Sequence, residues 1–456
     1  GELQTVTAGT GNLALGNGAG IVIESGGYYN TLIGDDAGKA ITTADYNTAL
    51  GYAALSANIS GASNTAVGRN ALLANTASYN TAVGNSAMSG NTSGTQNVAV
   101  GTLALDVNTT ADNNTAVGYS ALGANITGAN NTAVGRATLN VNTASDNTAV
   151  GNNALVVNTS GTQNVAVGAN ALDANTTASY NTALGHGALS TNISGASNTA
   201  VGRSALLLNT ASSNTAVGAS ALYDATDATH SSALGESALA NVTTGNSNTG
   251  IGKRAGYLIT TGDLNTAVGA YSLDVETVGD RSTAIGYSAL GSQVNTSNAD
   301  IYNSACGYYA GKTITTGKFN TCMGGQSGGV LTTGSDNTYL GYNTDASAVD
   351  VTDEIVIGRD VVGGGTATAR FGLGSNTAHD PASDEPCKGT GKTHHGFVAQ
   401  DVKRVIDSHE LANGHNIWSE DPDGTQQIAP GNFMPMAIKA IQELSAKVEM
   451  LEARLQ

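Results

Sequence analysis

The stretch Asn64-Thr65-Ala66-Val67-Gly68 recurs along the chain and decides its fold. Its 21 copies start at residues 12, 30, 47, 64, 80, 97, 114, 131, 147, 164, 181, 198, 214, 231, 248, 265, 282, 303, 320, 337 and 354. Twenty steps span the 342 residues between the first start and the last, which is about 17 residues per repeat. Helical-hairpin repeats need about 33 residues or more, so the period predicts one coil of a parallel β-solenoid, or β-roll, per repeat.

The fourth and fifth residues of the repeat indicate how each coil is built. The fifth residue is Gly in all 21 copies, as in Gly68, Gly84 and Gly101, which predicts a turn with positive φ or a site too crowded for a Cβ. The fourth residue is Val, Leu or Ile in nearly all copies, for example Val83. We expect this aliphatic column to face the core together with the second-position Thr, while Asn and Ala take the opposite face.

Asparagine opens the repeat in 18 of 21 copies, as in Asn64, Asn80 and Asn97. Amide side chains stacked at the strand spacing of about 4.8 Å are expected to hydrogen-bond along the column. After the glycine a second apolar stripe follows, as in Ala71-Leu72. The exceptions in the asparagine column are Ser231, Ser282 and Glu354.

A single coil has too thin a core to be stable alone. Burying one aliphatic side chain contributes roughly 1.5–3 kcal/mol, whereas ordering the backbone costs about 1–2 kcal/mol per residue. We therefore expect a homotrimer in which the small Ala-rich faces of three chains pack around one axis. Residues 1–359 would form its shaft.

The repeat resembles the head repeat of trimeric autotransporter adhesins, which reads Ser-Val-Ala-Ile-Gly and is a few residues shorter. The resemblance covers residues 12 to 358. It implies a left-handed parallel β-roll in a trimer. The longer coil of this chain departs from the family in loop length.

The composition changes near the C-terminus, where all five Pro and the single Trp lie beyond residue 380. Residues 360–382 are a Gly- and Thr-rich transition, and residues 383–456 are expected to form a small α+β domain. Its end, 436–456, has apolar residues at alternating steps of three and four, which predicts a coiled-coil helix. An amphipathic helix that folds back on its own domain is the alternative. The apolar residues are Ile441, Leu444, Val448, Leu451 and Leu455.

The stretches 394–402, His-His-Gly-Phe-Val-Ala-Gln-Asp-Val, and 440–444, Ala-Ile-Gln-Glu-Leu, resemble the intramolecular chaperone domain of phage endosialidases and tail fibres. That domain trimerises, templates folding of the stalk and often cuts itself off. The resemblance implies that Ser383 is the nucleophile and Lys388 its base, with the cut after Ala382. The family has a few dozen residues between this Lys and the His-Gly-Phe motif, where this chain has only 389–393, so an intact chain is the alternative.

Composition and charge exclude several classes of function. The net charge of −17 opposes binding to a phosphate backbone, and no apolar run is long enough to span a membrane. Three cysteines are too few for a disulfide framework, and Cys306 and Cys322 are expected to be small buried hydrophobes. His394-His395 lacks further ligands at metal spacing. We expect no metal, no cofactor and no enzymatic activity beyond a single self-cut.

Tyrosines gather in the last third of the repeats. Exposed tyrosines suit stacking on sugars or contact with protein, so residues 287–345 are a candidate receptor contact. Alternatively, the wider coils there need larger side chains as filler. The candidates are Tyr287, Tyr302, Tyr308, Tyr309, Tyr339 and Tyr342.

These patterns favour a bacteriophage tail fibre, located on the virion and adhesive in function. Its expected partners are two further copies of the chain, a host-surface glycan or protein receptor, and other tail proteins at the N-terminal end. One alternative is a bacterial trimeric surface adhesin, which needs a secretory signal and a membrane barrel that we do not expect here. Another is a polysaccharide-degrading tailspike, which needs paired acids in a groove. An ice-binding solenoid needs two exposed Thr columns, and each strand here supplies one.

Overall fold

The structure is a computed structural model that describes residues 3–4, 10–24, 26–297, 299–373, 418–420 and 426–428. The chain divides into two compact units, residues 1–247 (unit 1) and 248–456 (unit 2). The described residues of both units are all-β and contain no helix. Fourteen repeat strands in unit 1 and seven in unit 2 account for about 21 turns of parallel β-solenoid, which confirms the predicted fold class at this level.

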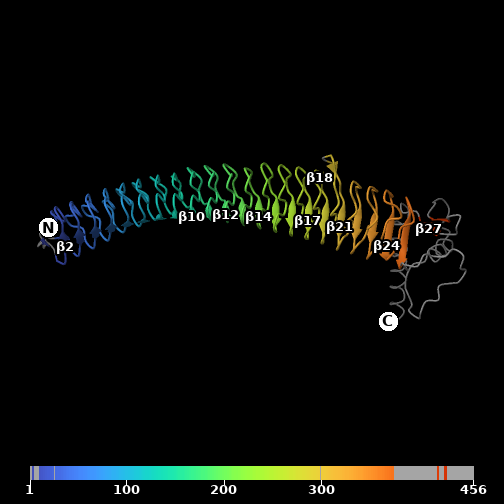
Figure 1. Ribbon diagram of the computed structural model, residues 1–456, viewed down its shortest axis with the longest axis horizontal. Helices are drawn as coiled ribbons and strands as arrows, with labels where there is room; N and C mark the ends of the chain where they lie inside the picture. Colours follow the sequence, from blue (N-terminus) through green and yellow to red (C-terminus); the bar gives the residue numbers. More distant parts are fainter. Residues whose placement is uncertain are drawn as a thin grey trace, which may run out of the picture. The chain divides into compact units, whose positions relative to one another are not determined.

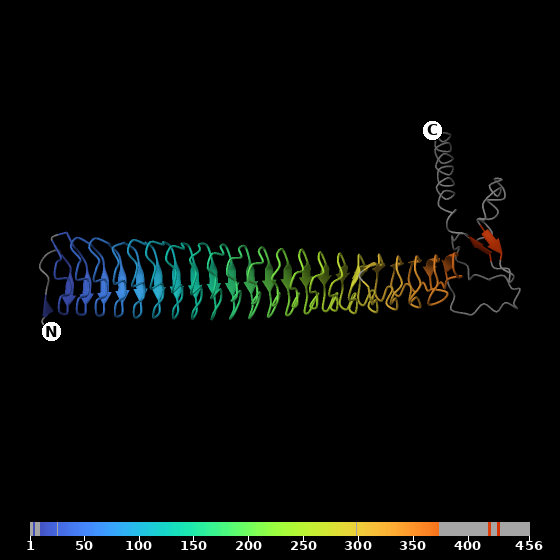
Figure 2. The ribbon, with the colours of Figure 1, turned by 90° about the horizontal axis from the view of Figure 1, so that it is seen from above.

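Unit 1 is a stack of three-residue strands, one per coil. Each strand pairs in parallel with the next in register, so that Thr65, Ala66 and Val67 lie beside the corresponding residues of the following coil. Figures 1 and 2 show these strands following one another along one side of the coils. A short strand, β1 (Leu3–Gln4), pairs antiparallel with β2. The repeat strands are β2 (Leu13–Leu15), β3 (Thr31–Ile33), β4 (Thr48–Leu50), β5 (Thr65–Val67), β6 (Thr81–Val83), β7 (Val98–Val100), β8 (Thr115–Val117), β9 (Thr132–Val134), β10 (Thr148–Val150), β11 (Val165–Val167), β12 (Thr182–Leu184), β13 (Thr199–Val201), β14 (Thr215–Val217) and β15 (Ser232–Leu234).

Unit 2 is built from the same kind of coil with more variation. Its repeat strands are β16 (Thr249–Ile251), β17 (Thr266–Val268), β19 (Thr283–Ile285), β21 (Ser304–Cys306), β22 (Thr321–Met323), β23 (Thr338–Leu340) and β24 (Ile355–Arg359). The coil with four extra residues, 282–302, adds a small parallel sheet of β18 (Gly279–Asp280) and β20 (Ala299–Asp300). One more parallel strand, β25 (Ala369–Leu373), pairs with β24, so the sheet extends into the segment predicted as a transition. β26 (Trp418–Glu420) and β27 (Gln426–Ile428) pair antiparallel.

We number the repeat from its asparagine, so that Asn-Thr-Ala-Val-Gly occupies positions 1 to 5. The two faces of the strand are the reverse of the prediction. Ala at position 3, as in Ala66, is fully buried, whereas the aliphatic residue at position 4 points outward and leaves Leu50 45% and Leu184 46% exposed. The predicted inward Val column and the predicted packing of Ala faces between chains are therefore wrong.

The thinness of the coil explains this reversal. The interior is filled from the opposite wall by the Ala-Leu pair, and Ala71 and Leu72 are both fully buried. Protein interiors are close-packed, so a narrow space that already holds Leu accepts a methyl group opposite it more readily than a branched side chain. Apolarity alone did not distinguish the faces, because Ala66 and Val67 both carry apolar side chains.

The glycine at position 5 satisfies two constraints at once. Gly101 has a φ of 139°, a region that side-chain-bearing residues rarely adopt. A Cβ on Gly101 would overlap the carbonyl oxygen of Gly118 in the next coil. The backbone conformation and the crowding between coils therefore both require glycine.

Asparagine at position 1 hydrogen-bonds along the stack. The Asn97 backbone N–H donates to Oδ1 of Asn80 at 3.0 Å, and its Nδ2 donates to the carbonyl of Ala111 at 2.8 Å. A second buried asparagine column, which the sequence analysis did not identify, lies at position 12, where Asn91 Nδ2 donates to Asn75 Oδ1 at 2.7 Å. Two columns of amides thus satisfy buried backbone groups that a thin apolar core would leave unpaired.

Coil length in unit 1 varies with a period of four coils. The coils that start at Asn64, Asn131 and Asn198 have 16 residues, and the coils between them have 17. Residues 47–247 are therefore three tandem blocks of 67 residues, namely 47–113, 114–180 and 181–247. The third block ends at the last residue of unit 1.

Candidate functional site

The outward face of the strands presents two residues of every repeat. Positions 2 and 4 carry no charged residue in any of the 21 repeats. Position 2 is mostly Thr and position 4 is aliphatic, with Leu234 50% exposed in unit 1 and Leu340 46% exposed in unit 2. We call these two columns the Thr/Val face.

A cluster of tyrosine rings lies on unit 2, and we call Tyr271, Tyr287, Tyr308 and Tyr309 the tyrosine patch. The rings of Tyr287 and Tyr308 stack with centroids 5.6 Å apart and planes 17° apart. Tyr309 lies 4.1 Å from Tyr308 and 5.5 Å from Tyr287, and Tyr271 meets Tyr287 edge-on at 5.8 Å. Tyr287 is 43% and Tyr308 53% exposed, so the rings are supported by one another and remain open to solvent.

Tyr271 lies outside the predicted contact range of residues 287–345, although it belongs to the same group of tyrosines in the sequence. It occupies position 7 of its coil, and Tyr287 occupies position 6 of the next coil. Strands β17 and β19 pair in register, which places equivalent positions of the two coils side by side. The 17-residue period therefore carried the signal that would have grouped Tyr271 with Tyr287.

Cations lie against the faces of the tyrosines. The Lys312 ammonium is 4.0 Å from the ring centroid of Tyr309, and the Arg254 guanidinium is 4.1 Å from that of Tyr257. Both distances are within the range of a cation–π interaction. Lys312 thus packs on one ring of the patch, and Arg254, which also lies 5.8 Å from the ring centroid of Tyr271, packs on a tyrosine outside it.

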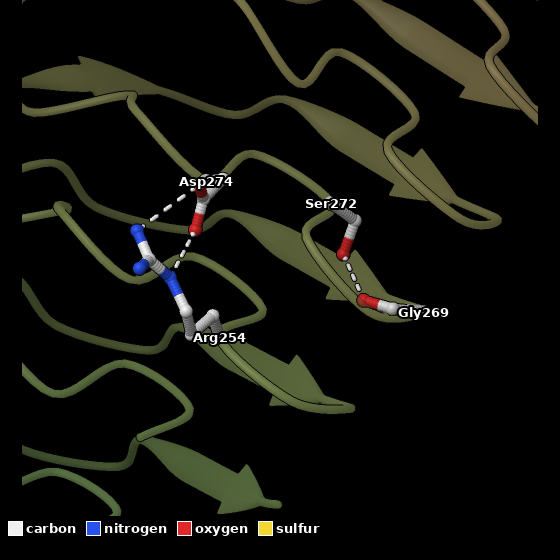
Figure 3. Close-up of polar contacts among 4 residues, drawn as sticks. All are labelled: Arg254, Gly269, Ser272 and Asp274. Carbon is white, nitrogen blue, oxygen red and sulfur yellow. Dashed lines mark hydrogen bonds and ion pairs between the residues drawn. The ribbon is translucent and has the colours of Figure 1, made fainter. Parts of the chain in front are cut away.

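Arg254 is held by a carboxylate from the following coil. Its Nε and one terminal nitrogen donate to the two oxygens of Asp274 at 3.0 and 3.2 Å, and Figure 3 shows the two groups facing each other. Hydrogen bonding to Asp274 raises the pKa of Arg254. In the same view, the Oγ of Ser272 donates to the carbonyl of Gly269 at 2.8 Å, which satisfies a hydroxyl placed where most other coils have Ala.

A second aromatic pair lies beside the coil with the insertion. Tyr302 and Phe319 stack with centroids 5.7 Å apart, and the Arg281 guanidinium is 5.7 Å from the Tyr302 ring. Arg281 also forms an ion pair with Asp300 of β20. Both aromatic residues occupy the position directly before the asparagine, whereas Tyr287 and Tyr308 follow the glycine.

Tyr339 is not available to a receptor, and this part of the predicted contact is wrong. It occupies position 3, the inward position, and is fully buried. Its hydroxyl donates to Oε2 of Glu354 at 3.0 Å, and burial, followed by the neighbouring Glu354 carboxylate, raises its pKa. Tyr339 therefore fills the coil, whereas Tyr342 is 51% exposed.

Buried ionisable groups occur in unit 2 away from the patch. Glu276 accepts from Gln293 Nε2 at 2.8 Å and from Asn295 Nδ2 at 2.7 Å in the coil with the insertion. Cys322 is buried, and burial raises its pKa to about 12. Cys306 is only half-buried because position 4 points outward, so the expectation of a buried Cys306 is wrong, and both cysteines are free.

Several predicted sites lie outside the described residues. These are Ser383 and Lys388, His394 and His395, and the coiled-coil residues Ile441, Leu444, Val448, Leu451 and Leu455. Within the described ranges, no three His, Cys, Asp or Glu side chains are grouped so as to hold a metal ion. The described part of the chain also contains no helix of the length and apolarity needed to cross a membrane.

Comparison with known proteins adds nothing to what the geometry indicates. No family model, curated protein sequence or solved structure matched the chain.

Proposed function

We propose that the chain is the shaft and receptor-contact region of a trimeric adhesive fibre, as in a bacteriophage tail. The observation that carries the proposal is the Thr/Val face. It combines Thr with aliphatic side chains, carries no charge, and is exposed or half-buried in the coils of both units. Extended apolar surfaces of this kind mark sites of association.

Charge supports association between copies through this face. A chain with net charge −17 repels its own copies wherever acidic surfaces meet. The Thr/Val face has no acid at positions 2 and 4, so copies meet there without that repulsion. The number of copies, three, comes from the resemblance to trimeric adhesin heads.

The tyrosine patch is the proposed receptor contact. Tyrosine supplies a large contact area with few rotatable bonds and a polar tip, which suits binding to either glycans or proteins. Four rings that touch one another on unit 2 form a pre-organised platform, because little side-chain entropy remains to be lost on binding.

We also propose that residues 383–456 form the chaperone that sets the trimer. If Ser383 cuts the chain, the mass under denaturing conditions will correspond to residues 1–382. A mass of 45.4 kDa, that of the whole chain, would show that no cut occurs. Fibre assembly does not depend on the outcome, because the chaperone can act without release.

Adsorption to cells tests the adhesive function. We expect the fluorescently labelled chain to bind the cells of at least one strain in a panel of bacterial isolates. Tyr308→Ala should reduce this binding at least tenfold. Tyr119→Ala is the matched control, because Tyr119 occupies the same repeat position in unit 1 and is 53% exposed. Equal losses for the two variants, or adsorption to no isolate, would contradict the proposal. Release of oligosaccharide from capsule would favour the tailspike instead.

A further inference from the structure

We propose that Arg69, Arg136 and Arg203 form a row on unit 1 that binds a linear anionic polysaccharide. We call these three residues the arginine row. They are the only Lys or Arg residues between 47 and 247, and they follow one another at intervals of 67 residues. The row occupies position 6, outside the Thr/Val face and in a different unit from the tyrosine patch. The inference therefore goes beyond the proposed receptor contact.

The backbone holds the three arginines in one column. They follow strands β5, β9 and β13, and every strand from β5 to β13 pairs in parallel and in register with the next. The carbonyl of each arginine also accepts the position-7 N–H of the following coil, as Arg69 does from Ser86 at 2.8 Å. Four strand spacings, about 19 Å, therefore separate the backbones of successive arginines.

The guanidinium groups of the row are available to a ligand. All three arginines are exposed, and none of their side chains forms a hydrogen bond, an ion pair or a ring contact with the described residues. In unit 2, by contrast, Arg254, Arg281 and Arg359 each form an ion pair with an aspartate. A guanidinium presents its donors in a planar fork that fits the two oxygens of a carboxylate.

The arginine is retained where the rest of its column has changed. Across the three 67-residue blocks, position 6 reads Tyr, Tyr and His in the first coil, Asn, Asn and Ala in the third, and Thr, Ala and Glu in the fourth. In the second coil it is Arg in all three blocks. Substitutions at exposed positions usually change folding stability little, so packing does not explain the retained arginine, whereas binding to a ligand does.

The column around the row carries no opposing charge. Positions 6 and 7 hold no Asp or Glu in any of the 11 coils between residues 47 and 230. Unit 1 therefore presents isolated positive charges along a neutral column, although the net charge of the whole chain is −17. An anionic polymer that follows this column meets three cations and no acid at these two positions.

The linear arrangement and the wide spacing select the class of ligand. Duplex DNA carries one charge per about 1.7 Å, far denser than the row, and the net charge of −17 repels it. An anionic membrane surface attracts clusters of roughly four to eight cations. A polysaccharide with carboxylates on its rings carries sparser charges along one line. A single exposed ion pair contributes little, but one polymer that reaches several arginines gains affinity through multivalency.

Biolayer interferometry of the full chain on immobilised hyaluronan and polygalacturonate tests the inference, with dextran as the neutral polymer. We expect binding to at least one acidic polymer at low ionic strength, and weaker binding as salt screens the charges. The triple variant Arg69→Gln, Arg136→Gln, Arg203→Gln should lower the affinity at least tenfold, and Arg69→Gln alone about two- to threefold. The matched control is Asn85→Gln, Asn152→Gln, Ala219→Gln, which changes position 6 one coil later and should bind as the wild type does.

Several results would overturn the inference. They are no binding to either acidic polymer, undiminished binding by the triple arginine variant, an equal loss in the control variant, and tighter binding to dextran or duplex DNA. Unchanged melting midpoints show that the variants fold. Cell adsorption separates this inference from the proposed function. If the triple arginine variant binds the polymers as the wild type does, while Tyr308→Ala loses adsorption, the arginine row is wrong and the adhesive function stands.

Discussion

Unit 1 and unit 2 share one coil but differ in what they bury and display. Among the described residues, the buried side chains of unit 1 include no ionisable group, whereas unit 2 buries Glu276, Cys322, Tyr339 and Glu354. Unit 1 repeats a 67-residue block three times, and unit 2 has an insertion and a tyrosine patch instead. The backbone pattern is thus independent of the side chains that distinguish a uniform shaft from a specialised surface.

The largest loss of folding stability is expected from substitution of the position-5 glycines, and this loss should be equal in the two units. Gly101→Val in unit 1 and Gly307→Val in unit 2 both impose a strained φ, which costs about 1–3 kcal/mol, and overlap with the next coil, which costs about 1–3 kcal/mol more. Denaturant unfolding followed by circular dichroism will measure the loss. Gly123→Ala is the control, because Gly123 has no positive φ. A loss confined to one unit would contradict the shared coil.

Replacement of the asparagine at position 1 should cause the next largest loss of folding stability. Asn97→Ala removes the acceptor for the backbone N–H of Asn114, at 2.9 Å, and the donor to Ala111. Each buried group left unpaired costs about 1–3 kcal/mol. Asn152→Ala, at an exposed position 6, should change the free energy of unfolding little. Similar effects for the two variants in denaturant unfolding would show that the asparagine column is not structural.

Alkaline pH should destabilise unit 2 more than unit 1. Burial raises the pKa of Cys322 from about 9 to about 12, so the unfolded thiol ionises first. The stabilisation from the neutral thiol is complete below pH 9 and is lost as pH rises toward 12 at about 1.4 kcal/mol per unit. Tyr339, whose pKa is also raised, acts in the same direction. We expect hydrogen exchange near pH 10 to show that unit 2 unfolds before unit 1. Cys322→Val should narrow this difference in protection between the two units. Equal loss of protection in both units would contradict this.

Removal of one 67-residue block from unit 1 should have the smallest effect on folding and on cell adsorption. Deletion of residues 114–180 joins Asn113 to Asn181, which begins a coil just as Asn114 did. Stacked repeats contact only their neighbours, so the remaining coils keep their packing. We expect unchanged circular dichroism per residue and unchanged cell adsorption. Deletion of 114–172, which leaves an incomplete coil, should destabilise unit 1, and tolerance of both deletions would refute the four-coil period.

The sequence allowed the coil to be predicted but not the direction in which its strands face. The period identifies the solenoid, and the invariant glycine identifies its turn, because only backbone geometry and crowding explain Gly101. The inward face depends on the thickness of the coil, which no single residue encodes, so Val67 was favoured over Ala66. The error extended to Tyr339, whose burial follows from its place at position 3.

Native mass tests the central claim, that the Thr/Val face joins copies of the chain. Light scattering of the wild-type chain should give about 136 kDa, three times the 45.4 kDa of one chain. Lysine at Val134 and Leu184, both exposed on the face, should lower that mass, and lysine at Asn152, outside the face, should not. A wild-type mass of 45.4 kDa would contradict the account, because the apolar face would then be open to water along the whole shaft.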